Sequence, residues 1–426
     1  MTTLALRPIA PPAVAARLFN RDFVLLWQAQ LVSQFGNQAF TIAMMLWTAE
    51  VTGSATMGGL MLMAGVLPMV LLAPLAGTFI DRRGSRRRII VTCDLISGVL
   101  VALLAVGLVA TGELRPGILF AVAVLRGVCN AFLDPAVNAF VPDLVPGKQI
   151  EAANAFRESS RQLTVLTAQG LGGILYGLFG PLWLFLLDAV SFMFAGGSEM
   201  MIRSDRQSAA PSANPAAAAP SFFGVAAEGF RYVAAQPGLV GFLVATSIFN
   251  ALLMPISVLL PVYATSYLHA DVRWYGFLLA AINAGAIGGC SLAAARMKSS
   301  GTGRRTILLA AFAALALSLA LLGQVESRWI ALAIACATGT LTGMINVSVM
   351  SIVQRRTSAE FRGRVIGLHA TMTRVLIPVG LVGGGAIADL TGRNVPLVFG
   401  VCGALALTSV VLLGARRNTR AFLASE

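Results

Sequence analysis

Charged residues are scarce in this sequence. Asp, Glu, Lys and Arg make up only 12% of the 426 residues, whereas 57% are hydrophobic and the mean hydropathy is +0.81. A soluble domain carries about 25% charged residues, because its surface must be covered with polar groups. A bilayer removes that requirement, since lipid solvates apolar side chains. The composition therefore argues against a soluble protein and predicts one embedded in a membrane.

The motifs of enzymes and metal proteins are missing as well. The sequence has no phosphate-binding Gly-x-x-x-x-Gly-Lys run, which argues against ATP as the energy source. Its 2 histidines, His269 and His369, fall on opposite sides of the membrane in the topology predicted below. The 5 cysteines lie singly in apolar segments, without the spacing of metal ligands or of a disulfide framework. We therefore expect no enzyme activity, no metal and no cofactor.

Long apolar runs account for most of the chain. A helix needs roughly 20 apolar residues to cross the hydrocarbon core, and by that measure the sequence predicts twelve transmembrane helices. They cover residues 23–48, 57–79, 89–110, 117–141, 154–178, 182–202, 238–267, 273–296, 305–323, 329–353, 364–388 and 395–414.

A stretch rich in Ala, Ser and Pro separates the sixth run from the seventh. It predicts a flexible linker, and apolar residues at helical spacing after it predict a short helix lying on the membrane surface. The sequence thus divides into an N-terminal six-helix bundle (1–202), a linker with an interfacial helix (203–236), and a C-terminal six-helix bundle with a short tail (237–426).

Basic residues are distributed unequally between the two sides of the membrane. The net charge of +13 could indicate nucleic-acid binding, but the arginines sit in short clusters between apolar runs, which is typical of membrane topology. Most of the 31 Lys and Arg fall on one side, and only Arg115, Arg273, Arg328 and Arg393 fall in loops on the other. The asymmetry predicts that both termini are cytoplasmic, and we expect no nucleic-acid partner.

The two halves of the chain repeat one another. When the sequence is shifted by half its length, Arg161 aligns with Arg374, and Gly170-Leu171-Gly172 aligns with Gly383-Gly384-Gly385. Two parallel repeats on either side of a linker are typical of a rocker-type transporter whose site lies at the interface between the repeats.

The turn after the second run combines glycines, an acid and arginines. We expect Gly77 to permit close helix approach and Gly84 to permit a tight turn. Asp81 and the arginines would then form a charged latch at the cytoplasmic surface, which holds one conformation closed. The alternative is a basic cluster that only sets topology. The predicted latch residues are Gly77, Asp81, Arg82, Gly84, Arg86 and Arg87.

The same turn resembles the signature loop of the major facilitator superfamily, Gly-x-x-x-Asp-Arg-x-Gly-Arg-Arg, with Ser85 in place of one arginine. Further motifs resemble the macrolide-efflux and siderophore-exporter branch of that superfamily. These are Asn20-Arg21-Asp22-Phe23, Arg126-Gly127, Asp134-Pro135-Ala136, Pro142-Asp143-Leu144-Val145-Pro146 and Phe361-Arg362-Gly363-Arg364-Val365.

The resemblance implies the major facilitator fold, an all-α membrane protein with twelve helices in two pseudo-symmetric six-helix bundles. It also implies a multi-pass exporter in the bacterial inner membrane, driven by proton antiport, and Asp94 as a partner of the latch. One antiporter motif is incomplete, because the fifth run reads Ala168-Gln169-Gly170-Leu171-Gly172-Gly173, with the glycines but without the proline.

A polar stripe marks the fourth run. Arg126, Asn130, Asp134 and Asn138 are four residues apart and share one helix face. A charge in hydrocarbon is costly unless it faces a cavity or a partner, so we expect Arg126 to face a central cavity. The resemblance implies a role for this arginine in proton coupling. The alternative is an inert ion pair that packs two helices together.

Two acids are candidates for the proton carrier, Asp134 on the stripe and Asp188 in the apolar sixth run. Burial favours the neutral form of a carboxyl group, which suits a proton relay. Asp134 could instead cap the helix broken at Pro135, and Asp188 could be a satisfied packing acid. Where relatives carry an acid in the first run, this chain has Asn37.

Polar residues inside other apolar runs are candidates for lining a substrate cavity, although each could simply bond neighbouring helices together. The predicted set is Gln34, Asn37, Arg126, Asn130, Asn250, Asn283 and Asn346.

The leading hypothesis is proton-coupled export of small amphipathic molecules by a monomer whose partners are substrate, protons and lipid. The alternatives are a dedicated siderophore exporter, a lysophospholipid transporter that needs no proton gradient, and a membrane scaffold that transports nothing.

Overall fold

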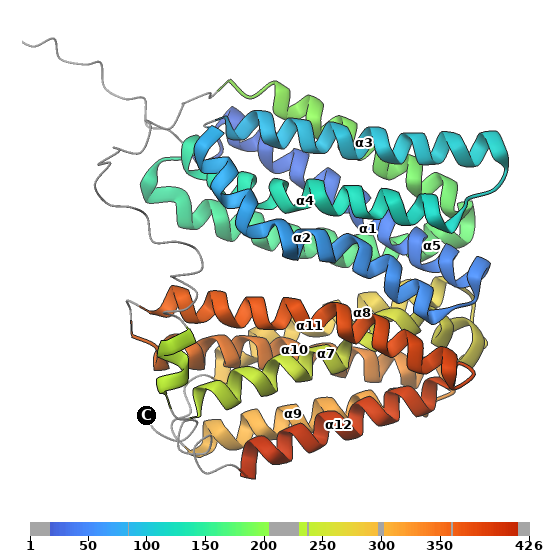
Figure 1. Ribbon diagram of the computed structural model, residues 1–426, viewed down its shortest axis with the longest axis vertical. Helices are drawn as coiled ribbons and strands as arrows, with labels where there is room; N and C mark the ends of the chain where they lie inside the picture. The colour runs from blue at the N-terminus through green and yellow to red at the C-terminus, as the bar shows by residue number, and fades with distance from the viewer. Residues whose placement is uncertain are drawn as a thin grey trace, which may run out of the picture.

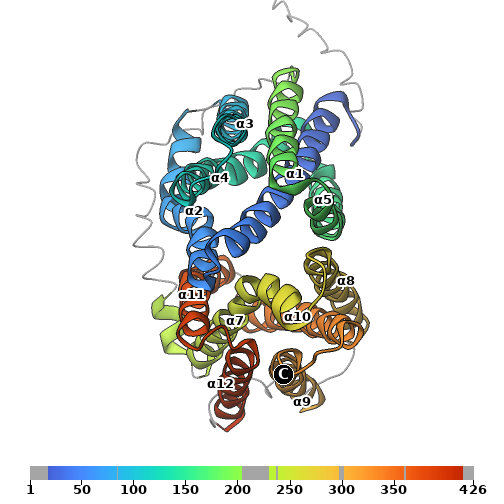
Figure 2. The same cartoon turned by 90° about the vertical axis from the view of Figure 1, so that its right-hand side faces the viewer.

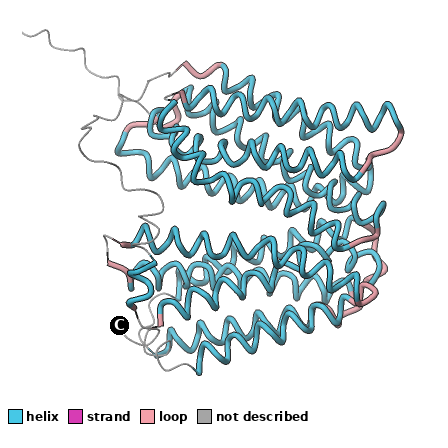
Figure 3. The backbone as a smooth tube through the Cα atoms, in the orientation of Figure 1, coloured by secondary structure: helices cyan, strands magenta, loops and turns pink. Residues whose placement is uncertain are grey.

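Helices make up almost all of the part of the chain that the computed structural model describes, and no strand occurs among those residues. The structure describes residues 18–83, 85–203, 230–236, 238–296, 302–358 and 361–415. Short loops join the helices, as Figure 3 shows. The predicted all-α class is confirmed.

The N-terminal half contains five long helices and one short turn. These are α1 (Arg21–Thr52), α2 (Ala55–Arg83), α3 (Arg86–Thr111), α4 (Pro116–Leu144), the 3-10 turn η1 (Gly147–Gln149) and α5 (Ile150–Met200). The C-terminal half contains α7 (Leu239–Val262), its π-helical continuation η2 (Tyr263–Tyr267), α8 (Arg273–Arg296), α9 (Thr302–Leu322), α10 (Arg328–Arg356), α11 (Arg362–Leu390) and α12 (Val395–Ala415).

Helix α5 is long because it contains two predicted spans. At Gly180 the backbone has φ 76° and ψ −177°, and Pro181 follows. A positive φ favours glycine, and proline removes a backbone donor, so the helix breaks there. The first arm covers residues 150–179 and the second arm 181–200.

Ten helices of the described chain are long and apolar enough to cross a membrane. Helix α1 is not among them, because the amides in its first half lower its hydropathy; they are Gln28, Gln30, Gln34, Asn37 and Gln38. The predicted twelve spans correspond to these ten only when α5 is counted as its two arms and α1 is added.

The two halves lie one above the other in Figure 1, with α1–α5 at the top and α7–α12 below. They meet along two helix pairs, α2 with α11 and α5 with α8. We call the end at which α1 begins and α12 ends the terminal end (left in Figure 1), and the other the opposite end. The ribbons of the halves diverge toward the terminal end, and Figure 2 views the molecule from the opposite end.

Buried apolar clusters follow the same division. The largest cluster joins the halves, since it contains Met44 and Trp47 of α1 together with Leu259 of α7 and Leu278 of α8. Two further clusters each lie within one half. Apolar packing therefore holds the two halves together at the opposite end, whereas each half has its own apolar cluster toward the terminal end.

Most of the predicted linker lies outside the described residues, as do residues 416–426 of the tail. Of the predicted interfacial helix, only residues 230–235 are described, and they are helical. There Tyr232 stacks on Phe361 with a ring separation of 4.4 Å, and its hydroxyl accepts a hydrogen bond from the Ser358 N–H.

Helices α8 and α10 approach closely because each carries a pair of glycines four residues apart. A Cβ atom added at any of the four would collide with a backbone carbonyl oxygen of the other helix. These glycines are Gly285 and Gly289 on α8, and Gly339 and Gly343 on α10. Small residues at this spacing allow backbones to touch in a membrane, where apolar burial alone does not drive association.

This packing predicts that Gly285→Ala destabilises the C-terminal half. The new methyl group would strike the carbonyl oxygen of Cys336, and such overpacking costs about 1–3 kcal/mol. Gly288→Ala is the matched control on the same helix, because its Cβ would meet no atom within 4 Å. We expect thermal unfolding in detergent to show a lower midpoint for the first variant only; equal midpoints would contradict the packing.

Candidate functional site

A cavity of about 690 Å³ lies in the N-terminal half, on the side that faces the C-terminal half. Helices α1, α2, α4 and both arms of α5 form its wall, and Arg374 of α11 lines it from the other half. Several of the predicted residues line this central cavity: Gln34, Asn37, Arg126, Asn130 and Asp134. The polar stripe of α4 thus faces the cavity, as its spacing indicates.

Arg126 lies on the cavity wall and is nearly sealed, with its side chain 4% exposed. Its Nη2 lies 3.0 Å from the Asp188 Oδ2 on the second arm of α5, and donates to the Asn37 Oδ1 on α1 at 2.9 Å. Aromatic rings complete the shell, because the guanidinium carbon lies 3.9 Å from the Phe40 ring centroid and 5.1 Å from that of Phe192. The arginine therefore has both an ion-pair partner and a face on the cavity.

A glycine on α1 makes room for this ion pair. A Cβ added at Gly36 would lie 2.8 Å from the Asp188 Oδ1 and would collide with the Ser191 hydroxyl. The Ser191 hydroxyl donates to the main-chain oxygen of Asp188 at 2.7 Å, which leaves the carboxyl group free to face Arg126. Close contact between α1 and the second arm of α5 thus positions Asp188.

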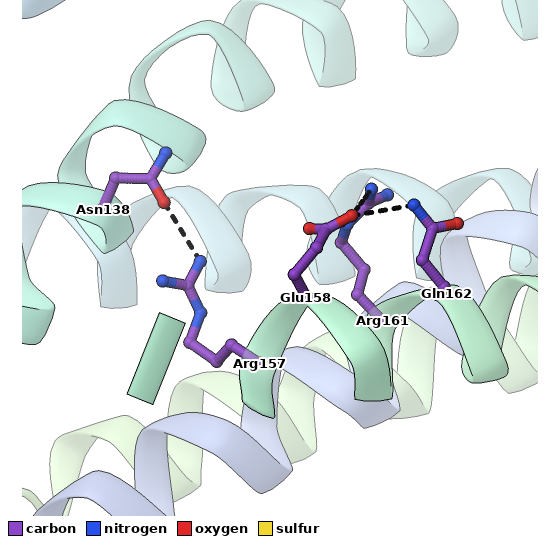
Figure 4. Close-up of polar contacts among 5 residues, drawn as sticks. All are labelled: Asn138, Arg157, Glu158, Arg161 and Gln162. Atoms are coloured by element: carbon purple, nitrogen blue, oxygen red, sulfur yellow. Dashed lines mark hydrogen bonds and ion pairs between the residues drawn. The ribbon is translucent and has the colours of Figure 1, made fainter. Parts of the chain in front are cut away.

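Asp134 lies two turns from Arg126, nearer the terminal end, and is exposed to the cavity. Its charged neighbours are Arg157 and Arg161 of α5 and Arg374 of α11. Arg157 donates to the Asn138 Oδ1 at 3.1 Å, while Arg161 donates two hydrogen bonds of 2.9 and 2.6 Å to the Glu158 carboxylate. Figure 4 shows how these side chains lie. The two predicted acids therefore occupy different places. Asp188 lies in the buried ion pair, and Asp134 lies among arginines in the part of the cavity nearer the terminal end.

Three predicted cavity residues lie outside the lining of the central cavity. Asn250 and Asn346 line a separate pocket of about 160 Å³ within the C-terminal half, together with His369. Asn283 on α8 donates to the Gln169 Oε1 on α5, across the two halves. A role for these asparagines in substrate binding stays a prediction.

The predicted latch is described only in part. The side chains of Asp81 and Arg82, and Gly84 as a whole, lie outside the described residues. Arg86 pairs with Asp143 at the end of α4 at 2.7 Å. Arg87 donates to the main-chain oxygens of Glu199 and Met200 at the end of α5. Both described arginines thus bind helix ends within their own half.

Two further residues of the predicted latch stay predictions. A Cβ added at Gly77 would meet no atom of the described residues within 4 Å, so those residues show no close helix approach there in this conformation. Asp94 is fully buried on α3, where its charged and thiol neighbours are Glu199 and Cys129. It faces the interior of its own half, because one side of α3 packs against α5.

Sequence reasoning missed a contact that joins the halves at the opposite end. Asp389, at the end of α11, accepts hydrogen bonds from the Ser54 hydroxyl (2.6 Å) and from the N–H groups of Ala55 and Thr56 (2.9 Å each). The first turn of a helix has free N–H groups and a positive dipole end, which favour a carboxylate. Ser54 before an apolar run is a recognisable helix start, but nothing in the sequence assigns Asp389 to it.

Backbones touch on either side of this contact. A Cβ added at Gly59 would lie 2.5 Å from the Leu381 oxygen, and one at Gly385 would lie 2.5 Å from the Ala55 oxygen. On the other helix pair, Gly173 of α5 packs directly on Gly276 of α8. The opposite end is therefore closed by protein contacts at both helix pairs, and the central cavity lies on the terminal side of them.

Comparison with known proteins agrees with this architecture. The family profile described as "Transmembrane secretion effector" matches residues 13–424. Macrolide efflux protein A of Streptococcus pyogenes is 24% identical over 385 residues, which cover 87% of this chain and 90% of that protein. Multidrug efflux pump Tap of Mycolicibacterium fortuitum is 26% identical over 378 residues, which cover 87% of this chain and 90% of that pump.

A solved structure with the same fold is the nucleoside transporter NupG, with a TM-score of 0.74 and 11% identity over 92% of this chain and 98% of that chain. At this identity the likeness shows the fold alone. The major facilitator fold and the resemblance to its efflux branch are confirmed, and the molecule is a transporter rather than an enzyme.

Proposed function

Because the chain belongs to the transmembrane secretion effector family of major facilitator transporters, we propose that it exports small amphipathic molecules across the bacterial inner membrane in exchange for protons. Efflux is the activity named for its relatives. The proton coupling and the class of substrate are the proposal, and they are argued from the central cavity.

The observation that carries the proposal is the ion pair between Arg126 and Asp188 on the wall of the central cavity. A carboxylate buried in a membrane protein is costly unless it is paired or protonated. When Asp188 takes up a proton, its O–H bond replaces the ion pair and Arg126 keeps only the neutral partner Asn37. The guanidinium then faces the cavity with an unbalanced charge, so protonation changes what the cavity can bind.

The cavity suits an amphipathic molecule. Its volume of about 690 Å³ lies within the range of roughly 300–1,000 Å³ that is usual for small-molecule sites. Its wall carries the amides of Gln34, Asn37 and Asn130 beside apolar side chains such as Met44 and Met69. Flexible methionines adapt to ligands of different shape, while the amides and Arg126 bind a polar group.

Alternating access follows from the position of the contacts between the halves. If the termini are cytoplasmic, as the arginine distribution predicts, this conformation receives substrate from the cytoplasm and is closed toward the outside. Export then requires the contacts of Asp389 to break and the terminal ends of the two halves to close. The latch predicted from Gly77 to Arg87 would hold that second conformation.

Transport in proteoliposomes tests the proposal. We expect an imposed proton gradient to drive an amphipathic cationic dye through the purified protein, with protons moving in the opposite direction. An ionophore that collapses the gradient should stop both movements, and liposomes without protein serve as the control. Dye or lysophospholipid movement that continues at the same rate after collapse would refute proton antiport and favour the gradient-independent alternative.

A further inference from the structure

Two acids meet inside the N-terminal half, away from the central cavity. Asp94 lies on α3 and is 0% exposed, and Glu199 lies at the end of the second arm of α5 and is 1% exposed. Helices α3 and α5 touch at this level, because a Cβ added at Gly196 would lie 2.8 Å from the Leu95 side chain, and the two carboxyl groups are electrostatic neighbours there. Neither residue lines the central cavity.

Few hydrogen-bond donors reach the two carboxyl groups. Gln30 of α1 donates to the Glu199 Oε1 at 2.9 Å. Both oxygens of Asp94 and the Oε2 of Glu199 are sealed from solvent and accept no hydrogen bond from a neighbouring donor. Cys93 and Cys129 are the titratable groups beside them. The guanidinium of Arg87 is close by but donates to main-chain oxygens of α5.

No ion pair within the described residues involves Asp94 or Glu199. An ionised carboxylate can only accept hydrogen bonds, so two ionised groups in contact would repel each other and leave sealed oxygens unsatisfied. Such a pair in a medium of low dielectric constant cannot hold both charges. A proton on one oxygen removes the repulsion and supplies the missing donor.

We propose that Asp94 and Glu199 share one proton, and that this carboxyl pair is a second proton-binding site of the transporter. The proton forms an O–H bond to one carboxyl group and an O–H···O hydrogen bond to the other. When it leaves for water, that O–H bond breaks and two negative charges face each other between α3 and α5. The site goes beyond the proposed function, because it lies outside the cavity and stands whether or not Arg126 couples transport.

The carboxyl pair is connected to the ion pair through the fold. Glu199 and Asp188 lie on the same arm of α5, eleven residues apart, which corresponds to about 16 Å along a helix. Cys129, one turn after Arg126 on α4, lies beside both Arg126 and Asp94. One helical arm therefore carries an acid of each site, so a shift of the arm at one site displaces the other.

Infrared difference spectroscopy of the purified protein in lipid tests the shared proton. We expect a carbonyl band of a protonated carboxyl group at neutral pH that Glu199→Gln removes or shifts. Glu113→Gln, which changes an exposed loop acid, should leave the band unchanged. A wild-type spectrum without such a band, or a band unaffected by Glu199→Gln, would overturn the proposal.

A second variant controls for misfolding, and a third distinguishes the carboxyl pair from the proposed proton coupling at Arg126. In Asp94→Asn an amide N–H can replace the shared proton as the donor to Glu199, so we expect a folded protein that lacks the carbonyl band. The double variant Arg126→Leu/Asp188→Leu, which leaves no unpaired carboxyl group at the ion-pair site, should retain the band even when it no longer transports. Loss of the band in Asp94→Asn together with a retained band in the double variant supports the carboxyl pair; the reverse result would reject the carboxyl pair without affecting the proposal for the central cavity.

Discussion

Arg126→Ala is expected to abolish gradient-driven export in proteoliposomes. Among the described residues, Arg126 is the cation paired with Asp188. Without it, proton uptake by that carboxyl group no longer changes the charge presented to the cavity. Breaking one side of a buried ion pair also costs about 3–5 kcal/mol, so the variant should unfold at a lower temperature. Transport and thermal stability are measured on the same preparation.

The double variant Arg126→Leu/Asp188→Leu separates function from packing. Replacing both partners of a buried ion pair by apolar residues often restores stability. We therefore expect the double variant to recover much of the unfolding temperature but no transport. If the pair only packed α4 against α5, transport would return with stability, and that result would refute the functional role.

Arg115→Ala is the matched control for the loss of one arginine, because Arg115 is an exposed residue in the loop before α4. Its transport should equal that of the wild type. Arg126→Lys tests the shape of the cation, since a lysine keeps the charge but loses the planar guanidinium that lies over the Phe40 ring. We expect an intermediate loss of transport from that variant.

The helices were predictable from the sequence because a bilayer sets their length and composition. Apolar runs had to extend over about 20 residues, so each predicted span overlaps a helix or an arm of a helix. Finer details were not predictable. The break in α5 is confined to Gly180, and helices continue past the apolar runs into polar residues, as α1 does to Arg21.

The candidate site was predictable where a charge lies deep in an apolar run. The cost of burying Arg126 and Asp188 indicated that each needs a partner or water, and the structure places them together. The sequence could not choose between Asp188 and Asp134, because pairing depends on how α5 packs on α4. Asparagines were ambiguous for the same reason, since Asn37 reaches the cavity while Asn250 bonds to its own helix.

The sequence analysis did not predict the roles of two acids near the ends of transmembrane helices. Glu199 and Asp389 both lie in the last turns of their helices, where water is usually close and a charge is inexpensive. In each case tertiary contact rather than local sequence sets the environment. α3 and α1 seal Glu199 inside its half, and α2 comes from the other half to meet Asp389.

Asp389 is the polar group best placed to hold the opposite end closed. Its carboxylate satisfies the first N–H groups of α2 and the Ser54 hydroxyl, and these contacts exist only while the two halves touch there. A carboxylate that caps a helix stabilises it by about 0.5–2 kcal/mol. Because the contact is lost when the end opens, that free energy favours the observed conformation over the alternative one.

Asp389→Ala is therefore expected to shift the conformational equilibrium toward opening of the opposite end by roughly tenfold, which corresponds to about 1.4 kcal/mol. Spin labels on α2 and α11 near the opposite end should report a larger population of long distances by pulsed electron resonance. Asp271→Ala is the control, because that exposed acid binds Arg273 two residues away in the same half. A distance distribution identical to the wild type would show that glycine packing alone closes this end.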